Sequence, residues 1–403
     1  MRSVLFVGAG RHQRRAILQA QQRGLRVVAV DRNPEALGLK VADAGEAVDF
    51  LDVDAVTEVA RRHGVGGALT VSADRAVPVV AAVTERLGLP SIGTDVALAM
   101  TNKVEMRSRL ARAGVPQPPW TALDDGHRMA EMGFSAFPAV LKPADSGGQR
   151  GVVRVETAEE AERLLPETLA ESRRGEAILE GFVDGVELNG IVVARGGEPA
   201  VLTLSDRLRP PGPGFGVGWI HVFPPTIPRE QLDVARRVAE DAVRALGLRD
   251  GIAFPQLIAA SDGRVVVVEV AARIPGGQMA DLVQHAVGVD LVEVALRMAL
   301  GEDVPDEVAL PKFEQPLAIR FFTSSPGPLP LGRVIRVGSL DPVLACEGVV
   351  QADTYLAVGE TIRPVRLDGD RRGYVIAVAD TNLEALARAE HAATQLTVEV
   401  ESA

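Results

Sequence analysis

The first hundred residues alternate between short apolar runs and stretches with the period of an amphipathic helix. In chain order, strand-like and helix-like segments alternate over Ser3–Val7, Gln13–Arg23, Leu25–Val30, Val56–His63, Gly67–Val71 and Ala76–Leu87. This alternation is typical of a parallel, doubly wound sheet, because parallel neighbours must be joined by crossover helices. We therefore expect an α/β domain over residues 1–98.

The rest of the chain predicts two further domains, which together give the protein a mixed α/β and α+β character. Residues 99–310 combine short strand-like runs with helices such as Arg229–Leu246, whose apolar positions keep a clear helical period. The proline-rich connection Val115–Pro119 predicts a hinge within this region. Residues 311–403 read as β-rich, with a helix near Asn382–Gln395.

Charge and cysteine content argue against several classes of partner. The net charge is −11 and no long basic run is present, whereas nucleic-acid binding usually requires a basic face. No apolar run approaches the ~20 residues of a membrane span, so we expect no membrane partner. The single cysteine, Cys346, cannot form an intrachain disulfide, which favours a reducing, cytoplasmic location.

The turn after the first predicted strand carries a weak dinucleotide-binding pattern. Gly8-Ala9-Gly10 stands between a strand and a helix, and Asp31 ends the next strand, as in folds that bind a pyrophosphate and a ribose. The third glycine of that pattern is replaced by Gln13, and any tight turn favours glycine. A dinucleotide-dependent oxidoreductase therefore stays open as an alternative.

Lysine is scarce in this chain. Only four of the 43 basic residues are lysines, namely Lys40, Lys103, Lys142 and Lys312. An ammonium and a guanidinium differ in shape and hydration, so a lysine kept against an arginine-rich background is a candidate for a specific role. Lys103 and Lys142 both stand within motifs that suit phosphate binding.

A set of motifs spread along the chain predicts an ATP site. The motifs are Thr101-Asn102-Lys103, Leu141-Lys142-Pro143, the glycine-rich turn Asp145–Val152, Ile178–Glu187, and Val266–Arg273 followed by Gly276-Gly277. Two lysines on separate elements can neutralise a triphosphate, and a glycine turn offers backbone N–H groups to its oxygens. Glu269, at the end of an apolar strand, can hold Mg²⁺, which prefers oxygen ligands. The nearby Arg273 can stabilise a developing oxyanion.

The order and spacing of these motifs resemble the ATP-grasp superfamily over nearly the whole chain. The resemblance implies an ATP-grasp fold with an N-terminal half-Rossmann, or pre-ATP-grasp, domain at 1–98. It implies an ATP-grasp domain at 99–310, with a lid subdomain at about 117–187, and a β-rich C-terminal domain at 311–403. The implied cofactors are ATP and Mg²⁺ or Mn²⁺, and the implied partners are small-molecule carboxylate and amine substrates.

The resemblance also implies roles for single residues. For the nucleotide these are Lys103, Lys142, Ser146, Gly147, Gly148 and Gly151 at the phosphates, Glu180, Phe182 and Val183 at adenine, and Glu187 at ribose. Glu269 and Gln256 are implied as metal ligands from adjacent strands, Arg273 as the stabiliser of the phosphoryl or tetrahedral intermediate, and His221 as a substrate contact. The other histidines, His12 among them, show no metal-site spacing and are expected to be structural.

Within the superfamily, the segment from Glu269 to Gly277 is most similar to that of L-amino-acid ligases and related carboxylate–amine ligases. Two positions depart from the wider pattern: Gln256 stands where an acid is usual, and Ala271 stands where many members have a metal-binding Asn. An amide oxygen can still ligate Mg²⁺, and the amino-acid ligases also lack that Asn. Both changes reduce the polar groups around the metal.

The implied activity is ATP-dependent ligation of a carboxylate to an amine. An acyl phosphate would form, ADP and phosphate would be released, and the first substrate would be an amino acid. A carboxylase of the bicarbonate or carbamate type and a non-catalytic nucleotide-binding protein stay open as alternatives. Gly277 and the segment Arg209–Phe215 suggest an adaptable substrate pocket, and a homodimer is the default expectation for a soluble enzyme.

Overall fold

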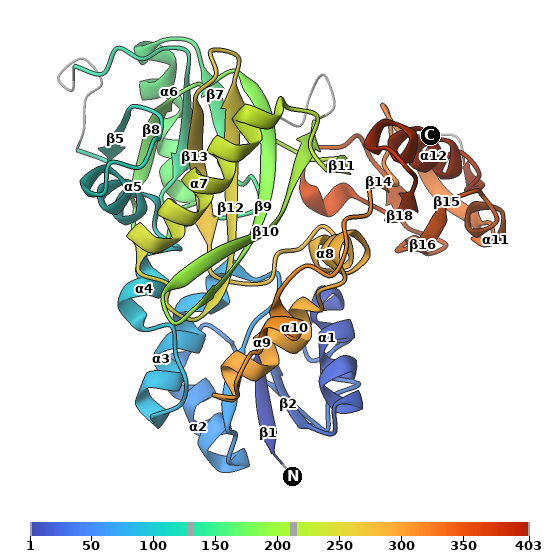
Figure 1. Ribbon diagram of the computed structural model, residues 1–403, viewed down its shortest axis with the longest axis horizontal. Coiled ribbons are helices and arrows are strands. Elements are labelled where there is room, and N and C mark those ends of the chain that lie inside the picture. Colours follow the sequence, from blue (N-terminus) through green and yellow to red (C-terminus); the bar gives the residue numbers. More distant parts are fainter. Residues whose placement is uncertain (1, 127–132, 210–215, 402–403) are drawn as a thin grey trace.

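The computed structural model describes residues 2–126, 133–209 and 216–401, and Figure 1 shows how the elements are arranged. Most of the segment Arg209–Phe215 thus lies outside the described residues. Mixed parallel and antiparallel sheets with flanking helices confirm the predicted α/β and α+β class. Among the described residues, no helix is long and apolar enough to span a bilayer.

The N-terminal segment forms a parallel sheet of strand order β3-β2-β1-β4. Its elements are β1 (Ser3–Val7), α1 (Arg11–Gln22), β2 (Arg26–Asp31), β3 (Ala44–Ala47), α2 (Val53–His63), β4 (Gly67–Leu69), a 3₁₀ turn at Asp74–Ala76, and α3 (Val77–Leu87). Strand β1 is buried along its whole length, which is why an unbroken apolar run encodes it. The predicted doubly wound sheet is confirmed; the half-exposed edge strand β3 has no apolar run and was not expected.

A small antiparallel sheet of order β5-β8-β6-β7 follows at the upper left of Figure 1. Two helices, α4 (Thr94–Ala99) and α5 (Lys103–Arg112), lead into it. Its strands and covering helix are β5 (Trp120–Leu123), β6 (Ala139–Pro143), β7 (Val153–Val155), α6 (Ala158–Ala170) and β8 (Ala177–Gly181). This sheet and the longer strands beside it form the two sides of the candidate site.

The central sheet has eight strands in the order β13-β12-β9-β10-β11-β14-β18-β16. Its strands are β9 (Gly185–Arg195), β10 (Glu198–Leu208), β11 (Ile220–Phe223), β12 (Gly251–Ala260), β13 (Val265–Ala271), β14 (Leu317–Phe321), β16 (Val349–Thr354) and β18 (Gly373–Val378). Helix α7 (Arg229–Leu246) packs on this sheet through one buried apolar face. Because β14, β16 and β18 extend the same sheet, it runs across the boundary predicted at residue 311, which stays a prediction.

The C-terminal segment adds a three-stranded sheet of order β17-β15-β19. Its remaining elements are β15 (Gly332–Val337), α11 (Asp341–Leu344), β17 (Thr361–Ile362), a 3₁₀ turn at Asp368–Asp370, α12 (Asn382–Ala393) and β19 (Val398–Glu401). This segment is β-rich as expected, and helix α12 falls within the predicted range Asn382–Gln395.

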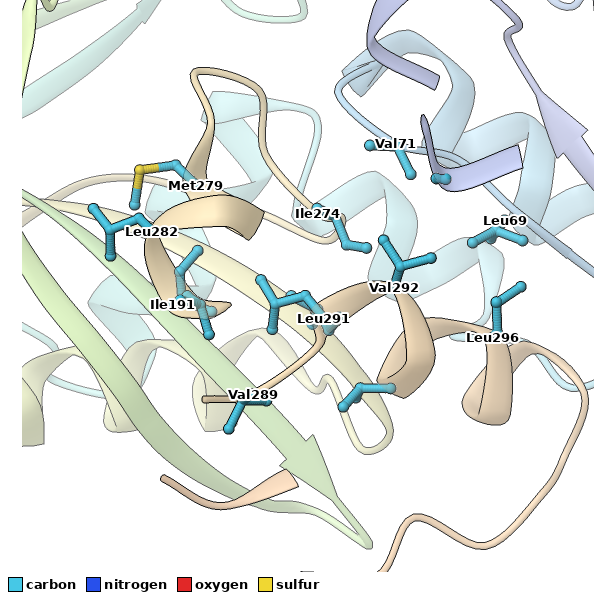
Figure 2. Close-up of a cluster of buried hydrophobic side chains, with 14 of the residues drawn as sticks. Leu69, Val71, Ile191, Ile274, Met279, Leu282, Val289, Leu291, Val292 and Leu296 are labelled. Atoms are coloured by element: carbon cyan, nitrogen blue, oxygen red, sulfur yellow. The ribbon is translucent and has the colours of Figure 1, made fainter. Parts of the chain in front are cut away.

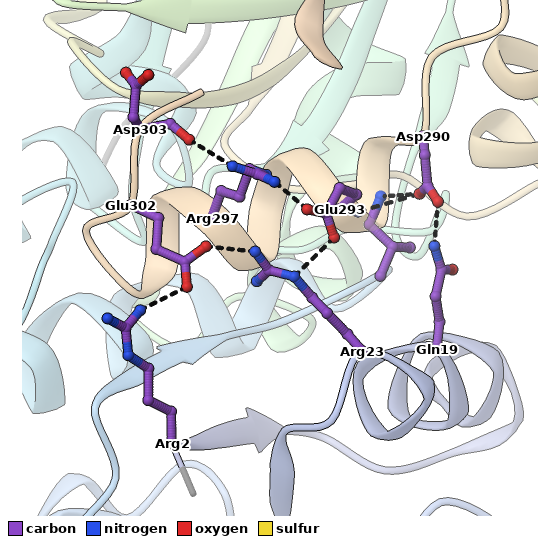
Figure 3. Close-up of polar contacts among 9 residues, drawn as sticks. Arg2, Gln19, Arg23, Asp290, Glu293, Arg297, Glu302 and Asp303 are labelled. Carbon is purple, nitrogen blue, oxygen red and sulfur yellow. Dashed lines mark hydrogen bonds and ion pairs between the residues drawn. The ribbon is translucent and has the colours of Figure 1, made fainter. Parts of the chain in front are cut away.

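Helices α8 (Met279–Val287), α9 (Leu291–Ala299) and α10 (Asp306–Ala309) connect the central sheet to the N-terminal domain. Figure 2 shows the apolar part of this contact, in which Leu291 and Leu296 of α9 share one buried cluster with Leu69 of β4. Figure 3 shows its polar edge, where Arg23, the residue after α1, pairs with Glu293 at 3.0 Å and with Glu302. The N-terminal domain is therefore held firmly against the end of the central region.

Candidate active site

A cleft of about 500 Å³ lies between the small sheet, the central sheet and the loops of the N- and C-terminal segments. Most residues expected from the sequence line it, namely Lys103, Lys142, Ser146, Gly147, Gly148, Glu180, Phe182, Val183, Glu187, His221, Gln256, Glu269 and Arg273. Gly151 is the exception: a Cβ built on it would lie 2.9 Å from Cγ of Pro143 and 3.1 Å from Cβ of Glu171, neither of which lines the cleft. The fold thus brings residues from five sequence motifs to one place, although their roles stay predictions.

A second cavity of about 660 Å³ lies between the N-terminal sheet and the back of the central region. Of the sequence-predicted residues it contains only Arg273. Two of its charged side chains already have partners: Arg195 pairs with Asp306 at 2.8 Å, and Asp250 accepts a hydrogen bond from the backbone of Gly196 at 2.7 Å. The cleft lined by the motifs is therefore the candidate active site.

The two lysines in the cleft are buried, whereas the other two are on the surface. Lys103 and Lys142 are each 5% exposed, while the side chain of Lys40 is 54% exposed and pairs with Glu35. Burying an ammonium group is costly unless it has an anionic partner or binds one. The structure therefore supports the inference that these two lysines were retained for a specific role.

Lys142 belongs to a buried ionic triad. Its ammonium lies 2.7 Å from Oε2 of Glu180, and Nε of Arg107 lies 2.7 Å from Oε1 of the same carboxylate. Burial raises the pKa of Glu180, but the charges and hydrogen bonds of Arg107 and Lys142 outweigh it and hold the pKa at about 2. Burial, opposed by Glu180, lowers the pKa of Lys142. The Glu180 carboxylate is thus engaged within the protein and holds Lys142 in place.

Arg107 is a central residue of the site that the sequence motifs did not identify. Besides Glu180, its guanidinium donates to the carbonyl oxygens of Val267 at 2.8 Å and Val268 at 2.7 Å. It therefore ties strand β8 of the small sheet to strand β13, which carries Glu269. One feature of the sequence could have pointed to Arg107. It stands four positions after Lys103 in a predicted helix, and residues with this spacing lie on the same helix face.

Lys103 opens helix α5, whose N-terminus is capped by the side chain of Asn102. Its ammonium donates to the backbone carbonyl of Ser146 at 2.8 Å and lies 3.3 Å from Oε1 of Glu269. The lysine thereby joins the glycine-rich turn to the predicted metal ligand.

The glycine-rich turn contains left-handed backbone conformations, which favour glycine. Gly148 has φ +71° and Gln149 has φ +67°, in the left-handed region that other residues rarely adopt. A Cβ on Gly147 would lie 2.9 Å from Oδ2 of Asp74, so the turn closely approaches the N-terminal domain. Backbone N–H groups in such a turn can bind an anion.

Glu269 and Gln256 face each other as register partners on β13 and β12. The side-chain amide of Gln256 donates to Oδ1 of Asn189 at 3.4 Å, which leaves the Gln256 carbonyl oxygen available as a ligand. Carboxylate and amide oxygens are ligands that Mg²⁺ accepts. No group of three or more His, Cys, Asp or Glu residues suited to a metal occurs among the described residues. The pair therefore fits Mg²⁺ that takes its remaining ligands from phosphates and water.

Arg273 is oriented by an acid from the N-terminal domain. Its Nε and Nη2 both lie 2.7 Å from Oδ1 of Asp74, and its Nη1 is buried without a hydrogen-bond partner. Burial raises the pKa of Asp74, but the charge and hydrogen bonds of Arg273 lower it more, so that the net direction is down. Asp74 was not identified from the sequence, because its short 3₁₀ turn carries no motif.

Of the residues expected at adenine and ribose, Phe182 and Glu187 line the cleft and each has a cationic neighbour. The guanidinium of Arg154 stacks over the ring of Phe182 at 4.4 Å. Glu187 pairs with Arg207 at 2.8 Å and with Arg209 at 3.3 Å. The expected ribose-binding carboxylate therefore already has two cationic partners, and a bound ribose would have to share it with them.

His221 is buried on β11, where Phe321 packs edge-on against its ring. Burial, followed by the charges of Arg371 and Arg207, holds the pKa of His221 well below its usual range, so the imidazole is neutral. His12, which we expected to be purely structural, also lines the cleft beside Tyr355. Histidine position alone could not have revealed this, because the cleft wall is assembled from distant segments.

The glycine turn at the start of the chain is occupied by the protein's own groups. Asp31 accepts a hydrogen bond from the backbone of Ala9 at 2.9 Å, and the side chain of Gln13 donates to the carbonyl of Val71. The acid and the turn of a dinucleotide site would have to be free for ribose and pyrophosphate. This geometry disfavours the oxidoreductase alternative.

Comparisons with known proteins identify the family to which the chain belongs. Residues 102–307 match the family described as carbamoyl-phosphate synthase L chain, ATP binding domain, and residues 325–401 match L-amino acid ligase C-terminal domain 2. The chain is 30% identical to a D-alanine–D-alanine ligase of Desulforudis audaxviator, over 68% of this chain and 90% of the relative. It is 28% identical to a formate-dependent phosphoribosylglycinamide formyltransferase of Ignicoccus hospitalis, over 98% and 95%.

Solved structures show the same fold. An L-amino acid ligase from Bacillus licheniformis superposes with a TM-score of 0.84 at 21% identity, over 100% of this chain and 99% of that one. A family model that spans residues 102–307 covers about half of the 403-residue chain and includes the predicted phosphate, adenine and metal positions. ATP and Mg²⁺ are the cofactors of this family, and the solved relatives include a complex with MgADP. The chain belongs to the ATP-grasp superfamily of ADP-forming ligases, in the family of the carbamoyl-phosphate synthase L chain ATP-binding domain.

Proposed function

We propose that this protein is an ATP-dependent carboxylate–amine ligase whose first substrate is an amino acid. One carboxylate oxygen of that substrate attacks the γ-phosphorus of ATP, and ADP leaves as an acyl phosphate forms. The amine then attacks the acyl carbon, phosphate leaves with the former carboxylate oxygen, and the amine loses a proton. The products are an amide, ADP and phosphate.

The observation that carries this proposal is the meeting of two buried lysines, an oxygen-ligand pair and a buried arginine in one cleft. Lys103 and Lys142 supply positive charge for the phosphates, and Arg273 supplies a guanidinium with an unpartnered Nη1. The match of residues 325–401 to an L-amino acid ligase domain supports an amino acid over bicarbonate as the first substrate.

Each group of residues in the cleft would have a separate role in the reaction. Lys142, fixed by Glu180, and Lys103 hold the phosphates in line for attack, which is how phosphoryl transfer is mainly catalysed. The turn Ser146–Gly148 closes over the phosphates and excludes water from the acyl phosphate. Arg273, held by Asp74, stabilises negative charge on the phosphoryl group and then on the tetrahedral intermediate. Mg²⁺ held by Glu269 and Gln256 would supply neutralisation of phosphate charge.

The test is phosphate release from MgATP with a panel of amino acids in all pairs, followed by mass analysis of the products. Release that requires both an acid and an amine, and that is lost in Glu269→Gln, supports the proposal. Bicarbonate serves as a separate arm: ADP formation with bicarbonate and no amino acid would instead support a carboxylase. Tight ATP binding without turnover on any acid would support a non-catalytic nucleotide-binding protein. The expected homodimer is checked by light scattering.

A further inference from the structure

Four arginines gather outside the cleft, around the glycine-rich turn. Two come from the N-terminal domain and two from connections of the small sheet, and together they are called the arginine cluster: Arg32 after β2, Arg75 in the 3₁₀ turn, Arg150 in the glycine-rich turn and Arg173 after α6. None of the four lines the cleft, so the nucleotide motifs do not account for them.

Contacts on both sides of the glycine-rich turn bring the cluster together. On one side, a Cβ on Gly147 would lie 2.9 Å from Oδ2 of Asp74, the residue before Arg75. On the other side, Oδ1 of Asp145 accepts a hydrogen bond from the backbone of Arg173 at 3.1 Å. The turn therefore lies between the N-terminal domain and the connection after α6, with an arginine on each side of it.

The arginines of the cluster act on one another as like charges. Burial, followed by the charges of Arg173, Arg150 and Arg32, lowers the pKa of Arg75, and Asp145 opposes this effect. The Asp145 carboxylate is itself engaged, because it accepts hydrogen bonds from the hydroxyl of Ser172 at 2.9 Å and from the next backbone N–H. The cluster thus holds an excess of positive charge.

The cluster also lacks anionic partners. Within residues 2–126, 133–209 and 216–401, no ion pair or side-chain hydrogen bond joins any of its four guanidinium groups to an acid. The Nε of Arg75 is buried without a hydrogen-bond partner. Leaving a buried donor of a charged group unpaired is costly, so this arrangement points to an anionic ligand.

The position of the cluster in the fold also suits a ligand. Strand β1 pairs in parallel with β2 on one side and β4 on the other. Arg32 directly follows β2, and Arg75 lies in the loop after β4, so both stand at the carboxyl edge of the sheet where the chain leaves β1 in opposite directions. Ligands of open parallel sheets bind at such switch points.

We propose that the arginine cluster binds a phosphate group, either free or as the monoester of a metabolite, and that the bound phosphate holds the glycine-rich turn against the N-terminal domain. Guanidinium forks match phosphate oxygens in shape and charge. A phosphate dianion between Arg75 and Arg150 would replace repulsion across this boundary by attraction to both sides. This inference goes beyond the proposed ligase function, since it concerns a second anion site outside the cleft.

The test is calorimetry on protein loaded with magnesium and the non-hydrolysable ATP analogue AMPPNP, which fills the cleft. Inorganic phosphate and glucose 6-phosphate are titrated separately, so that the free anion and a phosphate monoester are distinguished. The proteins are the wild type, Arg75→Gln, Arg150→Gln and the control Arg174→Gln. Arg174 is exposed and adjoins Arg173, but it is not among the charges that act on Arg75.

The wild type should bind at least one of the two probes, and the probe that binds more tightly identifies the source of the phosphate. Arg75→Gln and Arg150→Gln should each raise its dissociation constant about tenfold, the effect of losing one hydrogen bond to a charged group, whereas Arg174→Gln should leave it unchanged. Absence of binding at millimolar concentrations, or equal weakening in all three variants, would overturn the proposal.

Two further readouts separate ligand binding from a structural role. Without phosphate, Arg75→Gln should melt at or above the wild-type temperature, because a like charge has been removed; a lower melting temperature would assign Arg75 to folding and overturn the site. Phosphate should also tighten AMPPNP binding to the wild type and not to Arg75→Gln, because coupling between two sites is reciprocal. Equal AMPPNP affinity with and without phosphate would overturn the proposed link to the turn.

A failure of the ligase function would be recognised separately. It would show as no phosphate release with any pair of amino acids, whereas the anion site is tested by binding alone. Either proposal can therefore fail while the other stands.

Discussion

Replacing Glu180 by Gln removes the one negative charge from a buried triad and leaves its shape. Arg107 and Lys142 would then be two cations without this counter-ion. Both side chains are at most 6% exposed, so water could not replace it. Breaking a buried ion pair by removing one partner costs about 3–5 kcal/mol. We expect Glu180→Gln to be destabilised by that amount at pH 7, and to bind ATP more weakly because Lys142 is no longer held.

The stability that Glu180 contributes should also depend on pH in the acid range. The pKa of Glu180 is about 2 in the folded protein, against an ordinary value of 4.5. A folded-state pKa below the unfolded one gives stability that is present above pH 4.5 and lost as the pH falls towards 2. At ~1.36 kcal/mol per pKa unit this contribution is about 3 kcal/mol in total, of which about 1.4 kcal/mol is lost by pH 3.5.

Urea unfolding is monitored by circular dichroism at pH 7, 5 and 3.5. At each pH, the free energy of unfolding of Glu180→Gln is subtracted from that of the wild type. Glu167→Gln, which changes an exposed acid on α6, is the matched control. The subtraction cancels the other carboxylates. A wild-type advantage below about 1 kcal/mol at pH 7, or one that does not shrink between pH 5 and 3.5, would refute the reasoning.

Three further predictions concern the chemistry at the cleft. Asp74→Asn should lower kcat about tenfold without changing the ATP dissociation constant, because Arg273 loses its orienting charge; a change in ATP affinity alone would contradict this. Gly277→Ala should lower kcat/KM for the amino-acid substrates about tenfold, because a Cβ there would lie 3.4 Å from Nε2 of His221 inside the cleft and its φ of +65° is unfavourable; steady-state kinetics with saturating ATP measure it, and an unchanged kcat/KM would contradict it. Gln256→Glu should lower the Mg²⁺ concentration for half-maximal activity several-fold, because a carboxylate replaces an amide ligand; a magnesium titration showing no change would argue against the metal assignment.

Elements with a strong local pattern could be predicted from the sequence. β1 begins and ends where the unbroken apolar run Ser3–Val7 does, and α7 matches the predicted Arg229–Leu246. Strand β10 (Glu198–Leu208) was not expected, because its pairing with β9 and β11 and not a local alternation defines it. The pairing of β14 with β11 likewise joins segments that are far apart in the sequence. A domain boundary placed at residue 311 from local patterns does not predict this pairing.

The residues of the candidate site also fall into those that local sequence patterns predict and those that only long-range contacts define. Residues within contiguous motifs, such as Lys142 and Glu269, could be named in advance because chemistry and spacing occur together there. Asp74 could not, because it acts through Arg273, which is far away in the sequence, and a lone aspartate is normally a surface residue. Arg107 was missed because its partner Glu180 is equally distant in the sequence, and its spacing from Lys103 indicates only a shared helix face. Their importance becomes visible only when burial and contacts are known.

The central claim is that a carboxylate oxygen is transferred to the phosphate that leaves. The most direct measurement uses a substrate amino acid with oxygen-18 in its carboxylate, MgATP and the amine, with mass analysis of the released phosphate. The account predicts one oxygen-18 atom in each phosphate, dependence on the amine, and no labelled phosphate with Glu269→Gln. Phosphate without label, or label found in AMP, would contradict an acyl-phosphate mechanism.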